Sequence, residues 1–447
     1  MTTPEVPAAP RAAASERRLG PGLVTGAADD DPSGIATYSQ AGAGFGYHML
    51  WTVVLTLPLM AAIQLVSARL GYVTGHGLAA NIRRVFPRPL LWAVVALLLL
   101  ANTFNIAADV AAMGEALALL IGGPAQLYAV LFGLACLGLE VFLSYATYVR
   151  YLKWLTLALL SYVGVVFTVR VPWGTVLHDL LLPHLGIGHE TLFIVVAVFG
   201  TTISPYLFFW QAAEEMEDRH AGAAHRASAR TAPATASTPT AADPPPDAGP
   251  PPFGPEARRE LRRIRWDTWV GMAFSNLVAF FIILSTAATL HASGLTEIST
   301  AAEAAEALRP LGGPLTFLLF ALGIVGTGLL AVPVLAGSAA YAVAETLDWR
   351  EGLDYRLGEA PKFYGLIALA TVGGVAINFT GVDAIRALLW SAVLNGVVAV
   401  PIMVVMMRLA CDATVMGSYV LRRPLRWLGW LATAVMALAV VAMLATL

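Results

Sequence analysis

The sequence predicts an all-α integral membrane protein with about eleven transmembrane helices. Of its 447 residues, 58% are hydrophobic and only 13% are charged, whereas soluble globular proteins carry about 25% charged residues. Apolar runs recur at about the 20-residue length that a helix needs to cross a bilayer. Between these runs, the Lys and Arg residues gather in alternate loops, which is typical of the cytoplasmic loops of membrane proteins.

Ten uninterrupted apolar runs account for most of the predicted spans. They lie at 48–73, 89–120, 125–148, 151–171, 191–213, 266–290, 314–346, 361–379, 384–408 and 426–446. An eleventh stretch, residues 20–44, has the length of a span but is interrupted by Asp29, Asp30, Asp31 and Pro32. The charges of the loops decide whether this stretch also spans.

The positive charges favour counting residues 20–44 as a span. With eleven spans and a cytoplasmic N-terminus, only Arg170, Arg309 and Arg386 lie near the outside. Without this span every later loop changes side, against the positive-inside rule. An inverted chain with an outside N-terminus also fits the charges, but it leaves the Gly- and Asp-rich stretch as an unexplained tail. We predict a multi-pass protein of the bacterial inner (cytoplasmic) membrane with its N-terminus in the cytoplasm.

Two segments outside the spans are predicted to be disordered. Residues 1–18 are polar and lack the apolar core and cleavage site of a signal peptide, so we expect a cytoplasmic tail. Residues 219–262 are predicted to form a cytoplasmic linker, whose Ala/Pro/Thr-rich part has too little apolar surface to fold. We take it as a plain spacer and not as a Pro-rich docking motif. It divides spans 1–6 (19–218) from spans 7–11 (263–447).

The sequence contains no motif typical of a soluble enzyme. It has no phosphate-binding Gly-rich loop with a lysine, no His-Glu-x-x-His and no cysteine pair. Cys136 and Cys411 are isolated and are expected to be small core hydrophobes. The net charge of -2 suggests no nucleic-acid partner. We therefore expect no enzyme activity, no cofactor and no obligate protein partner, with the lipid bilayer as the surroundings.

Two of the predicted spans contain a polar break with a proline. The first has Gly26-Ala27-Ala28-Asp29-Asp30-Asp31-Pro32-Ser33-Gly34, and the sixth has Gly200-Thr201-Thr202-Ile203-Ser204-Pro205-Tyr206. Pro32 and Pro205 each remove a backbone donor and so unwind a turn. If spans 1–5 and 6–10 are inverted repeats, both breaks fall in the first helix of a repeat. Secondary transporters hold their substrates at such breaks.

The break residues offer oxygen ligands to a hard divalent cation. A carboxylate inside a span is costly and usually functional. Asp31, together with carbonyls freed around Ser33 and Thr201, would supply the ligands that such an ion prefers. The alternative is that the prolines only kink the helices and that the aspartates lie at the membrane interface. For Asp29 and Asp30 we favour this second interpretation.

At these residues the sequence resembles the natural-resistance-associated macrophage protein family, Nramp, which imports manganese and iron with protons. The resemblance covers nearly the whole chain and includes Gly20-Pro21-Gly22, the Asp-Pro motif, the Gly-Thr-Thr-Ile-Ser-Pro turn and the eleven-span layout. It implies the leucine-transporter fold, a 5+5 inverted repeat that holds the metal between broken helices 1 and 6. By position, Asp31 corresponds to the family's ligating aspartate, and Thr201 to an alanine whose carbonyl faces the metal.

Three positions of the site depart from the family. Gly34 replaces the asparagine of the family's Asp-Pro-Gly-Asn motif, Ser204 replaces a methionine, and Tyr206 replaces a histidine. Without a thioether, the remaining oxygen donors suit magnesium or manganese better than soft metals. Fewer and smaller ligands also leave room for a partly hydrated ion. We predict a site for Mg2+ or Mn2+, with Fe2+ a weaker candidate, made of Asp31, Ser33, Gly34, Thr201 and Ser204.

The third span carries a polar stripe formed by Asn102, Asn105 and Asp109, which share one helical face. The stripe either lines a permeation path or forms hydrogen bonds between helices. By resemblance, Asp109 corresponds to a carboxylate on the family's proton route, but the family's second acid is Ala112 here. With Tyr206 also replacing a histidine, transport without protons, or with different coupling, is a hypothesis beside proton symport.

A few further polar residues lie in predicted spans. Asn395 of the tenth span is a candidate for the permeation path, although Val393 takes the position of the family's metal-lining glutamine. Glu140, in the fourth span, has no predicted partner. The sixth span ends with Gln211, Glu214 and Glu215, which form either an acidic inner vestibule that attracts cations or a solvated helix end.

Together these features predict a secondary transporter of divalent cations that works by alternating access around Asp31. A carrier of an amino acid or another small organic solute on the same fold is the alternative. In such a carrier the helix N-termini at the breaks would face a substrate carboxylate, which the three consecutive aspartates disfavour. A membrane receptor or scaffold is the third hypothesis, and it would be indifferent to Asp31→Ala.

Overall fold

The computed structural model describes residues 20–446, apart from 143–155, 184, 185, 187, 232–253, 354 and 382. Within these residues the chain folds into helices and turns, with no strand. Nine stretches of described helix are long and apolar enough to cross a membrane. The all-α, multi-pass architecture is therefore confirmed. The predicted tail, 1–18, lies outside the described residues.

The first half of the chain supplies the first broken helix. Its helices are α1 (Pro21–Asp29), α2 (Pro32–Phe45), α3 (Leu50–Thr74), α4 (Leu78–Val85), α5 (Arg88–Ile121), α6 (Ala125–Phe142), α8 (Leu160–Thr168) and α9 (Trp173–Leu181). Between α2 and α3 the chain turns at Gly46, whose φ of 60° is strained for any residue with a Cβ. The fifth predicted span is described only from Thr156, where a short 3-10 turn leads into α8.

The second half supplies the second broken helix. Its helices are α10 (His189–Thr202), α11 (Pro205–Thr231), α12 (Pro255–Thr289), α13 (Ala301–Glu306), α14 (Arg309–Gly312), α15 (Thr316–Leu347), α16 (Pro361–Ile377), α17 (Ala384–Cys411), α18 (Ala413–Met416) and α19 (Arg423–Leu444).

The predicted linker, 219–262, is helical at both of its ends, and its remainder lies outside the described residues. Helix α11 continues to Thr231, and α12 already begins at Pro255. The start of α12 is charged and has no apolar run, so hydropathy gave no sign of it. Oppositely charged residues at helical spacing, such as Glu260 and Arg263, stabilise it instead.

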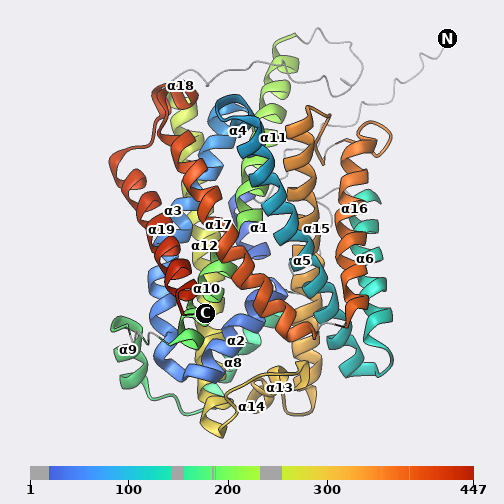
Figure 1. Cartoon of the computed structure of the whole chain (residues 1–447), viewed down its shortest axis with the longest axis vertical. Helices are drawn as coiled ribbons and strands as arrows, with labels where there is room; N and C mark the ends of the chain where they lie inside the picture. Colours follow the sequence, from blue (N-terminus) through green and yellow to red (C-terminus); the bar gives the residue numbers. More distant parts are fainter. Residues whose placement is uncertain are drawn as a thin grey trace, which may run out of the picture.

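The broken helices lie in the middle of the bundle, with α6 and α16 along one side and α19 along the other (Figure 1). We call the end with α4, α18 and the start of α12 the linker end, and the end with α9, α13 and α14 the far end. Large apolar side chains cover the outside, and Phe142 and Phe167 are each 83% exposed. Such a surface fits lipid hydrocarbon, where helices satisfy their own backbone hydrogen bonds.

Candidate functional site

The first break separates α1 from α2 at Asp30 and Asp31. Asp30 ends α1 with φ -83° and ψ 53°, and Asp31 is extended, with φ -71° and ψ 170°. Pro32 then opens α2 at its first position, where a missing N–H costs nothing because that group has no helical partner. The sequence therefore stops one helix and starts the next within two residues, and Asp31 becomes the N-cap of α2.

The second break separates α10 from α11. Ile203 ends α10 with φ -118° and ψ 62°, and Pro205 opens α11. The hydroxyl of Ser204 lies 2.8 Å from the carbonyl of Gly200 and 2.9 Å from that of Thr201, and donates to them. Ser204 therefore satisfies carbonyls that the break leaves without helical partners. Of the other predicted site residues, Ser204 contacts Thr201.

The carboxylate of Asp31 is buried and accepts hydrogen bonds on both oxygens. Oδ1 accepts from the backbone N–H of Gly34 (2.7 Å) and from the hydroxyl of Ser33 (2.8 Å). Oδ2 accepts from the side-chain amide of Asn105 on α5 (2.9 Å). Only 1% of Asp31 is exposed, and these three donors are uncharged. A carboxylate held this way is a ready ligand for a cation.

The two breaks meet at Ser33 and Thr201, whose hydroxyl oxygens lie 3.4 Å apart. Gly34 lies at the same place, and a Cβ on it would sit 3.2 Å from the Thr201 hydroxyl and 3.5 Å from Asp31 Oδ1. Glycine offers no side-chain ligand at position 34. It allows the start of α2 to approach the end of α10 closely. Asp31, Ser33, Gly34 and Thr201 are thus brought together as the sequence predicts.

Two asparagines extend this cluster across the bundle. The side-chain amide of Asn395 on α17 donates to the Asn105 oxygen at 3.5 Å, and the Asn395 oxygen itself is buried without a hydrogen bond. Val393 packs instead against Val196 and Ala197 of α10. Asn395, and not Val393, therefore faces the polar centre. The sequence left both positions open.

Asp109 lies on the same face of α5 as Asn105 and is fully buried. Neither of its carboxylate oxygens has a hydrogen bond. Asn102, the third member of the stripe, donates to the Leu335 carbonyl and the Ser338 hydroxyl of α15. The stripe therefore forms hydrogen bonds between helices at Asn102 and Asn105, and Asn105 and Asp109 face the polar centre, where the permeation path stays a prediction.

Asp29 and Asp30 are buried in the protein, which corrects the expectation that they lie at the membrane interface. Both carboxylates approach the hydroxyl of Ser275 on α12, at 2.5 Å from Asp29 Oδ2 and 3.1 Å from Asp30 Oδ1. Asp29 Oδ1 has no hydrogen bond. The sequence did not indicate Ser275, because a single serine in an apolar span is common and carries no signal of its own. Only the packing of α1 on α12 brings it to these acids.

Tyr206 connects the two breaks on the other side. Its hydroxyl donates to the Ala28 carbonyl at 3.0 Å, so the start of α11 holds the end of α1. Within the described residues, no three His, Cys, Asp or Glu side chains converge as ligands of one ion. A cation held at Asp31 would therefore be surrounded by hydroxyl, carbonyl and amide groups together with one carboxylate.

The sequence as a whole matches one protein family over almost its full length. Residues 22–446 match the family model described as "Natural resistance-associated macrophage protein-like", Nramp. This chain belongs to the Nramp family. The divalent metal cation transporter MntH of Klebsiella pneumoniae is 25% identical over 431 residues, which cover 93% of this chain and 91% of that protein. MntH of Yersinia pestis is 27% identical over 331 residues, covering 71% and 69%.

Solved structures show the same fold for this Nramp protein. The Eremococcus coleocola manganese transporter, in complex with an aromatic bis-isothiourea substituted compound, superposes with a TM-score of 0.69 at 19% identity, over 94% of this chain and 85% of that one. MhsT in complex with L-phenylalanine superposes with a TM-score of 0.60 at 11% identity, over 96% and 98%. These likenesses confirm the predicted leucine-transporter-like fold.

Toward the far end, apolar side chains close the space above the Nramp site. A pocket of only about 10 Å³ is left there, close to the smallest volume that can hold one water. Its lining comes from α2, α5, α13, α15 and α17 and contains no polar side chain: Ile35, Ala36, Ala112, Ala301, Ala304, Phe320, Ile324, Ile385 and Leu388. We call this set the apolar closure. Ala112, which replaces the family's second acid, is one of its members.

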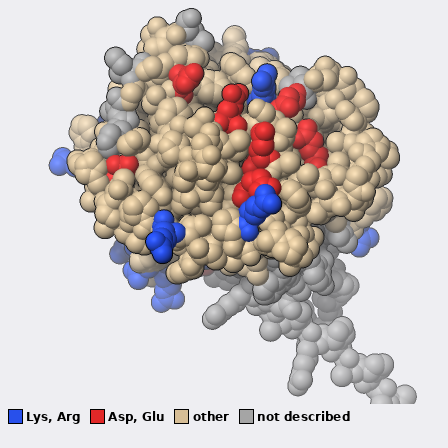
Figure 2. All heavy atoms as spheres, turned by 90° about the horizontal axis from the view of Figure 1, so that it is seen from below, with Lys and Arg blue, Asp and Glu red and all other residues tan. Residues whose placement is uncertain are grey.

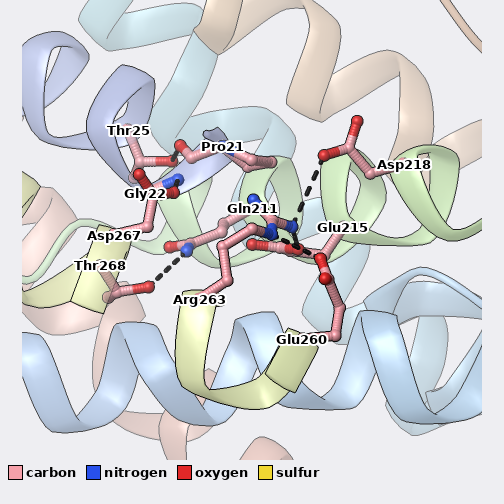
Figure 3. A network of polar contacts seen from close by, with 10 residues as sticks. All are labelled: Pro21, Gly22, Thr25, Gln211, Glu215, Asp218, Glu260, Arg263, Asp267 and Thr268. Carbon is pink, nitrogen blue, oxygen red and sulfur yellow. Dashed lines mark hydrogen bonds and ion pairs between the residues drawn. The ribbon is translucent and has the colours of Figure 1, made fainter. Parts of the chain in front are cut away.

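Toward the linker end, α1 is seated directly on α12. A Cβ on Gly271 would lie 2.1 Å from the Gly22 carbonyl oxygen, and one on Gly26 would lie 2.4 Å from the Gly271 carbonyl. No side chain fits between the two helices there. Asp267 of α12 also accepts a hydrogen bond from the backbone N–H of Gly22 at 2.7 Å, and so caps the start of α1 (Figure 3).

An ion-pair network continues this contact to α11. Arg263 of α12 lies 3.1 Å from Glu215 and 3.6 Å from Asp218, and also pairs with Glu260 of its own helix (Figure 3). Beside it, the side-chain amide of Gln211 donates to the Thr268 hydroxyl at 2.9 Å. We call the contacts of Arg263 and Asp267, with Gln211 and Thr268, the polar closure.

The polar closure answers one question left open by the sequence, the environment of the end of the sixth span. Gln211 and Glu215 are fully buried, so the end of the sixth span is not a solvated helix end. The Oε1 atoms of both residues have no hydrogen bond, so each is a buried acceptor that is still unused. Glu140 of α6 is also buried, with one carboxylate oxygen lacking a hydrogen bond, and the described residues do not explain it.

Proposed function

We propose that this Nramp protein transports divalent metal cations across the cytoplasmic membrane by alternating access. The observation that carries the proposal is the buried carboxylate of Asp31 at the meeting point of two broken helices. Burying a carboxylate is costly, and cations or hydrogen-bond donors must compensate for it. The names of the relatives, divalent metal cation transporters and a manganese transporter, support the same substrate class.

We assign Mg2+ or Mn2+ as the substrate, with Fe2+ a weaker candidate. The groups around the Asp31 carboxylate are the hydroxyls of Ser33 and Thr201 and the side-chain amide of Asn105, and Ser204 stands where the family has a sulfur ligand. Oxygen ligands suit hard cations, and magnesium usually keeps some of its water. For an ion to bind, Asn105 would turn its amide so that its oxygen, and not its N–H, faces the ion.

We place the linker end in the cytoplasm, as the distribution of positive charge suggests. The far end then faces the cell exterior, where acidic side chains gather on the surface (Figure 2). The loop before α13 and α13 itself supply Glu297, Glu303 and Glu306 there. These acids lie beside the apolar closure, to which α13 contributes, and would raise the local concentration of cations at the entrance.

Alternating access then requires the two closures to open in turn. Opening the apolar closure admits the ion from the far end, and opening the polar closure releases it at the linker end. The polar closure opens when α1 leaves α12, since α1 carries the first half of the break and ends at Asp29. The backbone at Asp30 and Asp31 belongs to neither helix and serves as the pivot.

Uptake into liposomes tests the proposal. Reconstituted protein is expected to take up Mn2+ and Mg2+, and not members of an amino-acid panel. Asp31→Asn should lower metal uptake by about a hundredfold or more, because even changes behind a ligand cost about ten- to a hundredfold. Asp348→Asn is the matched control, since its side chain is 81% exposed and far from the breaks.

Three outcomes would contradict parts of the proposal. Uptake of an amino acid without any metal would favour the organic-solute alternative. Full metal uptake by Asp31→Asn would move the site elsewhere. If Mn2+ moves while Mg2+ neither moves nor competes, the preference inferred from Ser204 is wrong.

We also infer that metal uptake does not require proton co-transport. Ala112 belongs to a dry apolar closure, and of the two acids of the third span, Asp109 and Glu115, only Asp109 is buried. Following internal pH during uptake tests this inference. Internal acidification that disappears together with metal uptake in Asp109→Asn would establish proton symport and overturn it.

A further inference from the structure

A second site lies at the linker end, away from the two breaks. A cleft of about 590 Å³ opens to the surface between the end of α17 and the start of α19, beside α18. Its lining is formed by Arg408, Cys411, Asp412, Ala413, Arg426 and Trp430. Figure 1 shows α18 at the linker end, on the side of the bundle opposite α6 and α16.

The cleft is positively charged. Arg408 and Arg426 line it from two different helices, and Arg422 and Arg423 precede Arg426 by about one turn. Arg69 of α3 is near enough to Arg422 for the two charges to repel. One acid, Asp412, lines the cleft with these cations, and hydrogen bonds from the backbone N–H and hydroxyl of Thr414 lower its pKa below its usual value.

The chemistry of the two lining arginines suits a phosphate group. Guanidinium groups bind phosphate oxygens with two parallel hydrogen bonds, which a lysine cannot do. Arg426 and Trp430 are four residues apart and therefore share one face of α19. A tryptophan beside basic residues at a span end is typical of the headgroup region of a bilayer.

Exposed apolar side chains continue from this cleft along the outside of α17 and α19. Val404 precedes Arg408 by one helical turn on α17 and is 39% exposed, while Trp427 and Leu431 of α19 are 74% and 50% exposed. A soluble phosphate would use only the arginines. A phospholipid would use both parts, with its headgroup at the arginines and its acyl chains along the exposed apolar residues.

We propose that this cleft binds the headgroup of an anionic phospholipid of the surrounding leaflet. Arg408 and Arg426 hold the phosphate, and Trp430 packs beside it. The negative charge of Asp412 repels headgroups that carry more than one negative charge. Basic pockets between membrane helices recognise anionic lipids in this way. The site is separate from the metal path and does not depend on the transport function proposed above.

Native mass spectrometry of the whole protein tests the proposal. Protein in nanodiscs of phosphatidylcholine mixed with phosphatidylglycerol is released into the gas phase, and retained lipid is identified by mass. Wild-type protein should retain phosphatidylglycerol in preference to phosphatidylcholine. The variant Arg408→Ala/Arg426→Ala should lose about thirtyfold of this preference, since each arginine near a membrane surface contributes about fivefold.

Two further variants keep the result interpretable. Arg386→Ala removes one arginine from the opposite end of α17 and should leave the preference unchanged. Arg408→Lys/Arg426→Lys keeps the charge but removes the paired hydrogen bonds, and it should retain an intermediate preference even if the alanine variant folds poorly. Unchanged retention in both double variants would overturn the proposal. Displacement of phosphatidylglycerol by inorganic phosphate would also overturn it, because the site would then bind a soluble anion.

Discussion

The two ends of the proposed path are closed by different kinds of contact. At the far end, the apolar closure brings nine apolar side chains from five helices around a nearly vanished pocket. At the linker end, the polar closure joins α1, α11 and α12 by ion pairs, hydrogen bonds and direct backbone contact. The chemistry of the two closures has little in common.

The difference concerns what each closure needs in order to open. Separating apolar side chains exposes surface to water, which costs about 25 cal/mol per Å². Separating ion pairs exchanges them for hydration, and its net cost is smaller where the partners are already partly exposed. Arg263 is 36% exposed, while Glu215 is fully buried. We therefore expect the polar closure to respond to charge and salt, and the apolar closure to respond to side-chain volume and polarity.

The largest effect is expected from Ala112→Glu, which places a carboxylate in the dry apolar closure. Burying an unpaired charge costs several kcal/mol, so the far end should open. Labelling of Ile35→Cys by a membrane-impermeant maleimide, in a background without Cys136 and Cys411, measures this opening. Labelling should rise at least about tenfold, corresponding to about 1.4 kcal/mol.

Ala112→Gln is the matched control for that experiment. It has the same size without the charge and should open the far end less. Equal labelling of Ile35→Cys in the parent and in Ala112→Glu would show that the apolar closure is not what excludes water there.

A smaller effect is expected from Arg263→Ala, which leaves Glu215 buried without its cation. Breaking a fully buried pair costs about 3–5 kcal/mol, and we expect about 1–3 kcal/mol because Arg263 is partly exposed. The linker end should open, and a cysteine at the fully buried position Thr25 of α1 should label faster. Arg259→Ala is the control, since it removes an exposed arginine of the same helix. Labelling that rises equally in both variants would refute a specific role for Arg263.

Gly271→Ala tests the backbone contact of the polar closure without changing its charges. The added methyl group would lie 2.1 Å from the Gly22 oxygen and must push α1 away from α12. Overpacking of this kind costs about 1–3 kcal/mol, so labelling of Thr25→Cys should again rise. In Gly373→Ala the new Cβ meets only Thr103 at 3.5 Å, an ordinary contact. A wild-type labelling rate in Gly271→Ala would mean that α1 does not need this fit.

The smallest effect is expected from the exposed ion pair of Arg83 and Asp348, which lie 2.7 Å apart at the linker end. The hydrogen bond from Arg83 lowers the pKa of Asp348. The stabilisation from this ion pair is therefore present above the pKa that Asp348 has in the unfolded chain. It is lost as the pH falls through the lower pKa that Asp348 has in the folded protein. Exposed pairs contribute about 0.5 kcal/mol, so thermal unfolding of Arg83→Ala near neutral pH should change little. If Arg83→Ala lost as much stability as Arg263→Ala, buried and exposed ion pairs would not differ in their contribution here.

The sequence contained enough information to find the breaks but not to orient every side chain at them. Pro32 and Pro205 fix where the helices stop, and helical spacing puts Asn105 and Asp109 on one face. The directions of Asp29 and Asp30 depend on how α1 is rotated against α12, which one helix's sequence does not specify. The same holds for Asp267, whose role as a cap requires knowing which helix end lies beside it. The helical start of α12 inside the predicted linker escaped because charge spacing, and not hydropathy, stabilises it.

The hydrogen bonds of Asp31 have a consequence for the return half of the transport cycle. A carrier that has released its ion must reverse its conformation with the ligand carboxylate still buried. Gly34, Ser33 and Asn105 supply three donors that can stand in for the lost cation during this step. The unloaded carrier can therefore turn over without a counter-ion, and the protein should perform net accumulation of metal and not only one-for-one exchange.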